Sequence, residues 1–302
     1  MRSMPVTATI LEASQWTPLA NHHEARARAF GEPFVDRRMK GKKHPIEDFL
    51  FTYYTQKPGQ LYRWHPGMNV VLSGEQAQQR ADWKFYRPVQ TASGTGYEFD
   101  AQAFVQARAR AIDFARVILA GTSERAGNFA CFGLHEWAMA YKSEVNGIRH
   151  EYLPLRLGAA ATDEVVETEK IRCTHFDAFR FYTPQAVGLN ELQPTRETQR
   201  DLEQPGCLHA NMDLYKWAYK LSPAVPSDLV MDCFELAWDI RTMDMQASPY
   251  DLGDWGHEPI RIETPSGKAE YVRLQKQFAD RADVLRLRLL EVANNLPLIV
   301  QD

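Results

Sequence analysis

Apolar residues recur at helical spacing in three long segments of the chain. In residues 100–118 they fall on one face of a helix, and Asp100 is placed to cap its N-terminus. The same spacing recurs in residues 227–245, where Ser227 can act as the cap, and in residues 268–294. Because periodic apolar faces recur over segments of this length, helices are expected to dominate the fold.

Shorter elements are predicted between these helices. Residues 21–30 have the polar pattern of an exposed helix, and Pro45 followed by two acidic residues indicates the start of another helix. Residues 148–173 have the pattern of strands or extended links, and they are the expected minor β component. We therefore predict a mainly α-helical protein that forms a single globular domain over residues 1–302.

The composition is that of a folded protein with no overall attraction to nucleic acid. Of the 302 residues 44% are hydrophobic and 25% are charged, and the net charge is -4. A contact with DNA would therefore require a local basic patch. The chain has no apolar run of membrane-spanning length and no signal-like pattern in residues 1–19, and its four cysteines are widely spaced. These features predict a soluble cytoplasmic protein with reduced thiols and no membrane partner, and no protein partner is predicted.

One local basic patch follows the first helical pattern. Five of the seven residues from Arg37 to Lys43 are Lys or Arg, and we call residues 37–43 the basic segment. We expect it to form a loop near the N-terminus. Clusters of this kind attract the phosphates of nucleic acid, but they also occur as solvated loops.

Candidate chemistry is densest in residues 203–217. Pro205-Gly206 indicates a turn, and a helix is predicted after it. His209, Asp213 and Trp217 then lie four residues apart and form one row on the surface of that helix. The row could hold a metal ion, carry a proton-transfer pair beside an aromatic surface, or be a salt-bridged packing face.

A second group of polar residues lies in residues 174–184. If this run is extended, His175 and Asp177 point to the same side, either toward a ligand or as an internal pair that satisfies itself. A lone buried carboxylate would be costly, and both segments combine a His–Asp pair with aromatic residues. We therefore expect His209 and Asp213 to share a pocket with His175 and Asp177.

Common nucleotide-binding and hydrolase motifs are missing from the sequence, including G-x-x-x-x-G-K-[ST], G-x-G-x-x-G, H-E-x-x-H and G-x-S-x-G. Four runs instead resemble a bacterial family whose members are commonly labelled 3-methyladenine DNA glycosylase, namely residues 47–54, 63–67, 174–180 and 204–217. The resemblance spans nearly the whole chain. The Leu-Pro-Gly-Val-Gly-like hairpin of helix-hairpin-helix glycosylases is not found in the sequence, so no catalytic residue is assigned by motif.

The resemblance implies a DNA-repair N-glycosylase that excises alkylated bases of the 3-methyladenine type from double-stranded DNA without a cofactor. Such an enzyme flips the base into a pocket, stacks it on aromatic side chains and uses a carboxylate to assist hydrolysis of the glycosidic bond. A cationic alkylated base would also suit an aromatic pocket. The candidate catalytic residues are Asp213, Asp177, His209 and His175. The candidate substrate-binding residues are Trp217, Tyr215, Asn211, Tyr54, Trp64, Arg63 and Arg180.

Two other hypotheses remain open. In the first, the protein is a helical metal-dependent oxidase or hydrolase that acts on a small molecule, and His and carboxylate side chains from several helices converge on iron or zinc. The candidate ligands are His135, Glu136, His175, Asp177, His209, Asp213 and Asp239, although a paired Glu-x-x-His motif is missing. In the second, the protein is an interaction module, which would leave the polar residues beside aromatics unexplained.

Overall fold

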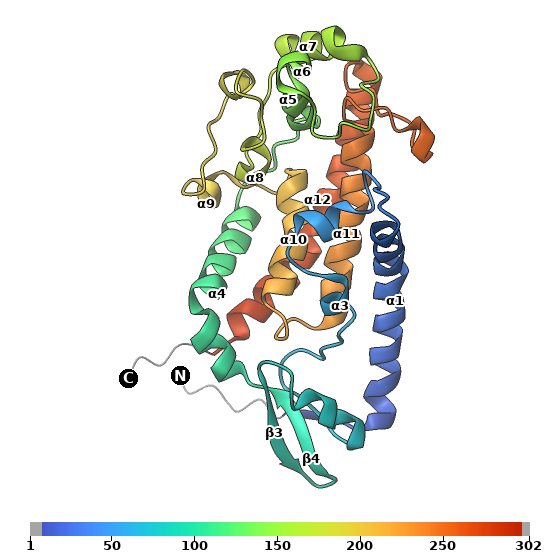
Figure 1. The fold of residues 1–302 in the computed structure, drawn as a ribbon. Helices are drawn as coiled ribbons and strands as arrows, with labels where there is room; N and C mark the ends of the chain where they lie inside the picture. Colours follow the sequence, from blue (N-terminus) through green and yellow to red (C-terminus); the bar gives the residue numbers. More distant parts are fainter. Residues whose placement is uncertain (1–7, 298–302) are drawn as a thin grey trace.

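The computed structural model describes residues 8–297, and helices dominate it (Figure 1). Four long helices contain most of the α-helical residues: α1 (Ala13–Met39), α4 (Ala101–Glu124), α11 (Ser227–Gln246) and α12 (Pro265–Asn295). The only sheet among the described residues has four strands. The prediction of a mainly α-helical fold with a minor β component is confirmed.

The three long helices predicted from apolar spacing are present as α4, α11 and α12. At the start of α4 the Asp100 side chain accepts a hydrogen bond from the backbone N–H of Ala103 at 2.9 Å, as a cap should. The prediction that Ser227 caps α11 is wrong, because Ser227 is already helical. Its hydroxyl instead accepts a hydrogen bond from the backbone N–H of His65 at 2.8 Å. This contact joins the loop between Leu61 and Val70 to α11.

Replacing Asp100 by Ala is expected to lower the free energy of unfolding by about 1 kcal/mol, because the N-terminus of α4 loses its side-chain acceptor. Chemical denaturation measures this change. Asp113→Ala on the same helix is the control, since Asp113 is exposed and pairs only with Arg116. Equal stability of the two variants would contradict the assigned cap.

The centre of the molecule is α10 (Leu208–Lys220), a helix of which almost every residue is buried. It packs against both α11 and α12, and α4 packs against α12. Phe114 of α4 also contacts Trp217 of α10. In the view of Figure 1, α1 and α4 flank this central group on opposite sides. The most chemically dense segment of the sequence therefore lies in the interior.

The sheet does not lie where the sequence pattern placed it. Its strands are β1 (Thr9–Leu11), β2 (Val70–Leu72), β3 (Tyr86–Thr91) and β4 (Gly94–Phe99), in the order β1-β2-β4-β3, and only the β1–β2 pair is parallel. The predicted strands in residues 148–173 are wrong. Much of that segment is α7 (Gly158–Thr168), where Thr162 and Val166, one turn apart, are its two buried residues.

Short elements connect these parts. The remaining α-helices are α2 (Phe49–Tyr53), α3 (Pro58–Leu61), α5 (Leu134–Ala140), α6 (Ser143–Asn146), α8 (Phe176–Phe179) and α9 (Gln199–Leu202), and 3-10 turns cover η1 (Glu75–Arg80), η2 (Val187–Leu189) and η3 (Gly253–Trp255). The helix predicted to begin at Pro45 begins only at Phe49, because residues 45–48 form a turn. No helix in residues 8–297 combines the length and the apolarity needed to cross a bilayer.

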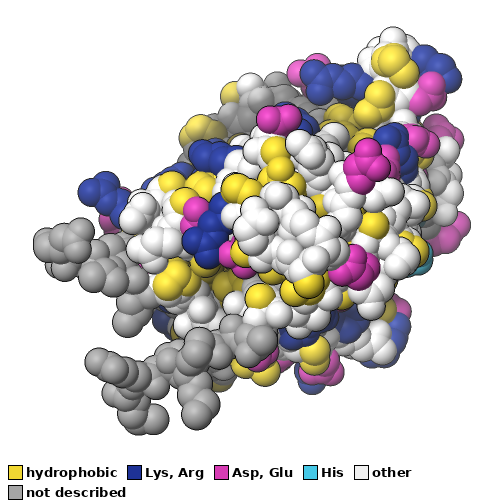
Figure 2. All heavy atoms as spheres, turned by 90° about the horizontal axis from the view of Figure 1, so that it is seen from below, with side chains coloured by type: hydrophobic (Ala, Val, Ile, Leu, Met, Phe, Trp, Pro, Cys, Tyr) yellow, Lys and Arg dark blue, Asp and Glu magenta, His cyan; other side chains and the backbone are white. Residues whose placement is uncertain are grey.

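The basic segment is only partly a loop. The predicted helix over residues 21–30 belongs to the much longer α1, whose last turn includes Arg37. Arg37 pairs with Glu47 at 2.6 Å and with Asp48 at 2.7 Å, and Lys40 pairs with Asp36 at 2.8 Å. These ion pairs neutralise part of the expected positive charge locally. On the separate face drawn in Figure 2, Lys and Arg side chains are likewise interspersed with Asp and Glu.

Candidate metal centre

Helix α10 carries His209 and Asp213 one turn apart, and both side chains are buried. Asp213 Oδ1 accepts a hydrogen bond from the Tyr54 hydroxyl at 2.9 Å. Its Oδ2 lies 3.3 Å from His175 Nε2 and also contacts the Lys216 ammonium. The predicted proximity of His175 to the α10 pair is therefore present in the structure.

A first triad forms around Asp213 and consists of His175, Glu203 and Asp213. His175 immediately precedes α8 and Glu203 immediately follows α9, so three separate segments meet here. His175 Nε2 lies 3.3 Å from Glu203 Oε1, and one ligand atom of each residue lies within 4.8 Å of the others. An imidazole and two carboxylates at this spacing can share one cation.

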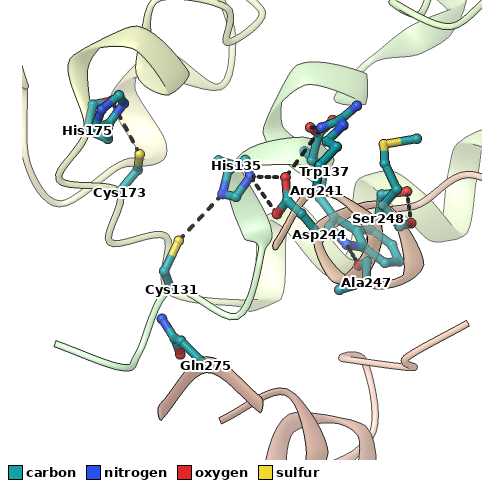
Figure 3. Close-up of polar contacts among 12 residues, drawn as sticks. Cys131, His135, Trp137, Cys173, His175, Arg241, Asp244, Ala247, Ser248 and Gln275 are labelled. Carbon is teal, nitrogen blue, oxygen red and sulfur yellow. Dashed lines mark hydrogen bonds and ion pairs between the residues drawn. The ribbon is translucent and has the colours of Figure 1, made fainter. Parts of the chain in front are cut away.

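A second triad consists of His135 on α5, His209 on α10 and Asp244 on α11. The nearest oxygen of Asp244 lies 3.0 Å from His135 Nε2, and the three ligand atoms again lie within 4.8 Å. Figure 3 shows His135 between the Cys131 sulfur and the Asp244 carboxylate. Two imidazoles and one carboxylate are a donor set typical of non-haem iron.

The two triads adjoin each other through His209. The centroid of its ring lies 4.5 Å from that of His135 and 5.4 Å from that of His175. We call the combined cluster the six-residue centre, and it consists of His135, His175, Glu203, His209, Asp213 and Asp244. No member is more than 8% exposed.

His209 differs from the other two histidines in its electrostatics. Burial and the nearby His135 hold the pKa of His209 well below its ordinary value, so its ring is neutral. No hydrogen bond joins this ring to another residue within the described chain. A neutral, buried and unpartnered imidazole is suited to bind a metal ion.

The other two histidines are held by carboxylates. Burial would lower the pKa of His175, but hydrogen bonds to Asp213 and Glu203 outweigh it and raise this pKa to about 9. Asp244 in the same way holds the pKa of His135 above its ordinary value against the effect of burial. The Nδ1 atom of His175 is buried without a partner.

A shell of polar side chains supports the carboxylates. Buried Arg241 donates a hydrogen bond to Glu136 at 2.7 Å and contacts Asp244 at 3.4 Å. Gln199 donates to Glu203. Burial alone would raise the pKa of Asp213, but Lys216 and His175 hold it below its ordinary value. Supporting contacts of this kind orient ligands at metal sites.

Two small hollows meet at His209. One is lined by cysteines 131, 173 and 207 with Tyr271, and the other by Phe49, Tyr53, Phe181 and Arg241 among others. Each has a volume of about 10 Å³. This is roughly the space that one water molecule needs. Each hollow therefore has room for no more than about one water-sized molecule beside His209.

Three predicted ligands lie outside the six-residue centre, and two of its members were not predicted. Glu136 pairs with Arg241, Asp177 pairs with Arg180 at 3.0 Å, and Asp239 pairs with Arg281. The segment after His175 is the short helix α8 rather than the extended run on which the pairing of His175 with Asp177 was predicted. Asp177 nevertheless lines one of the two hollows together with His209, and it lies 3.7 Å from the Lys216 ammonium that contacts Asp213. The unpredicted members are Glu203 and Asp244.

The predicted substrate-binding residues fall into two groups. Tyr54 and Tyr215 lie near Asp213, with ring centroids 5.4 Å apart, but both are buried. The other five residues have different partners or lie elsewhere. Trp217 packs against Phe114, Asn211 binds Arg286, and Arg180 pairs with Asp177. Trp64 stacks on Trp16, and Arg63 is exposed. One shared pocket for all of these residues is therefore not present.

No model of a known protein family, no curated protein and no solved structure matches the chain. The resemblance to the glycosylase family stays a prediction.

Proposed function

We propose that the protein is a metal-dependent oxidase that acts on a small molecule and holds iron in the six-residue centre. The observation that carries the proposal is the convergence of three imidazoles and three carboxylates in two adjoining buried triads. Buried ionisable groups are expensive unless they are paired or bind metal. Six of them in one place favour a function over a packing role.

The choice of metal follows from the donor atoms. All six donors are imidazole nitrogens or carboxylate oxygens, which suit iron, manganese and zinc. The triad of His135, His209 and Asp244 has the two-histidine, one-carboxylate composition of non-haem iron oxygenases. The neighbouring triad offers one imidazole and two carboxylates to a second ion. Because the His209 ring lies 4.5 Å from that of His135 and 5.4 Å from that of His175, centroid to centroid, two ions would lie close together, as they do in two-metal centres.

The choice of reaction class follows from access to the centre. The hollows beside His209 leave space only for a very small ligand, which restricts a co-substrate at the ring to a molecule as small as dioxygen. Aromatic side chains, Phe49, Tyr53 and Phe181, give the second hollow an apolar wall, which suits a small non-polar molecule. We therefore favour oxidation by dioxygen at iron over hydrolysis at zinc.

The glycosylase hypothesis requires different properties from the same residues. A catalytic carboxylate would have to face a flipped base, whereas Asp213 is 1% exposed and its oxygens contact Tyr54, His175 and Lys216. Trp217, the proposed stacking surface, is also buried. In the metal hypothesis Asp213 binds an ion in its buried position, and for this reason we prefer that hypothesis.

Metal-free protein titrated with iron(II) under anaerobic conditions is expected to bind two ions per chain, one at each triad. Admission of dioxygen should then consume oxygen and oxidise the bound iron, which an oxygen electrode and the ultraviolet–visible spectrum measure. Zinc(II) titrated in parallel is the control for binding without redox chemistry. Failure to bind either metal would contradict the proposed centre, and binding of iron without oxygen consumption would contradict the oxidase.

A further inference from the structure

A second candidate site lies away from the six-residue centre, at the opposite end of α10. It is a cleft of about 450 Å³, and its volume far exceeds that of the hollows beside His209. Its chemically important lining residues are Arg63, His65, Trp83, Lys84, Arg108 and Lys220, and we call it the cationic cleft. None of its lining residues is Asp or Glu.

Four separate segments supply the positive charges of the cleft. Arg63 follows α3, Lys84 precedes β3, Arg108 lies on α4 and Lys220 ends α10. None of these four side chains forms an ion pair or a hydrogen bond with another residue of the described chain. Elsewhere in the protein many Arg side chains are paired, as Arg26 is with Asp232 and Glu235. The four charged groups therefore line the cleft without an ion-pair partner among the described residues.

Burial is the main influence on the ammonium of Lys220, and it holds the pKa of Lys220 below its ordinary value. The nearby cations Lys216 and Arg108 act in the same direction, whereas the Asp213 and Asp177 carboxylates oppose them. His65 does not add to the charge, because burial and the Arg80 guanidinium lower its pKa to about 3. An anion bound in the cleft would favour the charged form of Lys220.

Contacts among its own side chains support the wall of the cleft. The guanidinium of buried Arg80 lies 3.7 Å from the centroid of the Trp83 ring, and Arg63 lies 5.2 Å from it. His65 Nδ1 lies 3.0 Å from the Tyr86 hydroxyl. Next to Trp83 and Lys84, Phe85 adopts a positive φ of 65°, which is uncommon outside glycine. Pre-ordered walls reduce the entropy that binding would otherwise cost.

We propose that the cationic cleft binds a phosphate-bearing ligand. Two guanidinium forks and two ammonium groups match the several oxygens and the multiple charge of a phosphate or pyrophosphate better than a single carboxylate. The volume leaves room for a group attached to the phosphate, and Trp83 and Phe85 offer aromatic surface for a planar base. Free nucleotides and nucleic-acid strands both carry phosphate groups and planar bases. The binding experiment described next distinguishes these two sources.

Isothermal titration calorimetry of the full chain with inorganic pyrophosphate, adenosine 5′-monophosphate and a single-stranded oligonucleotide tests the proposal. At low salt, at least one of these ligands is expected to bind, and the double variant Arg63→Ala with Lys220→Ala should weaken binding by at least about tenfold. The matched control is Lys42→Ala with Lys43→Ala, which removes two exposed cations of the basic segment. This control should leave the affinity unchanged.

The outcomes separate the sources of phosphate. Binding of the nucleotide or pyrophosphate as tightly as the oligonucleotide indicates a small ligand. Much tighter binding of the oligonucleotide with a steep dependence on salt indicates a nucleic-acid strand. If none of the three ligands binds, or if the control variant weakens binding as much as the cleft variant does, the proposal is overturned. Iron binding by the cleft variant should equal that of the unmodified protein, so this test does not depend on the proposed function.

Discussion

Replacing His209 by Ala is expected to lower the affinity for iron(II) by at least about tenfold. Loss of a residue that only supports a metal ligand already costs this much, and His209 is a ligand itself in the proposed centre. It also joins the two triads, with ring centroids 4.5 Å from His135 and 5.4 Å from His175. Anaerobic titration followed by elemental analysis measures the change.

The same variant should fold nearly as well as the unmodified protein when metal is absent. No described residue loses a hydrogen bond with the His209 ring, so the cost is limited to the cavity that the substitution leaves. The control is His23→Ala, because the buried His23 ring donates a hydrogen bond to the Leu61 carbonyl at 2.8 Å. We expect that variant to lose stability and to keep its metal. A His209→Ala protein with unchanged iron affinity would contradict the proposed centre.

The long helices were predictable because one face of each packs against the core. In α4 the buried residues Phe104, Ile112 and Ile118 follow the helical spacing that the sequence displays. The sheet was not predictable in the same way. Strands such as Thr9–Leu11 and Val70–Leu72 have only three residues each, which is too short for alternation to be distinguished from a loop.

The α10 part of the centre was predictable for a local reason. His209 and Asp213 are four residues apart, so helix geometry alone puts them on one face. Glu203 and Asp244 joined the centre through tertiary contacts that no spacing reveals. Glu203 lies at the end of a one-turn helix, and Asp244 is one of several acidic residues on α11. Only the packing of α11 against α10 selects Asp244 among them.

Replacing Arg241 by Met is expected to destabilise the metal-free protein by about 3–5 kcal/mol. The guanidinium is 2% exposed, and it donates to Glu136 at 2.7 Å and contacts Asp244 at 3.4 Å. Its loss leaves one buried carboxylate without its cation and a second one with less compensation. Denaturation in guanidinium chloride with a chelator present measures the change. Arg281→Met, which breaks an ion pair about half exposed, should cost less than about 1 kcal/mol.

A second substitution separates charge compensation from packing in this prediction. If the cost arises from the unpaired Glu136 carboxylate, Glu136→Gln added to Arg241→Met should recover part of the lost stability, and the two changes should not be additive. Iron(II) should also recover stability in Arg241→Met, because an ion at the triad of Asp244 replaces the missing positive charge. Additive costs together with no effect of iron would show that Arg241 acts through its contact with the Phe49 ring, 4.1 Å away, rather than through the carboxylates.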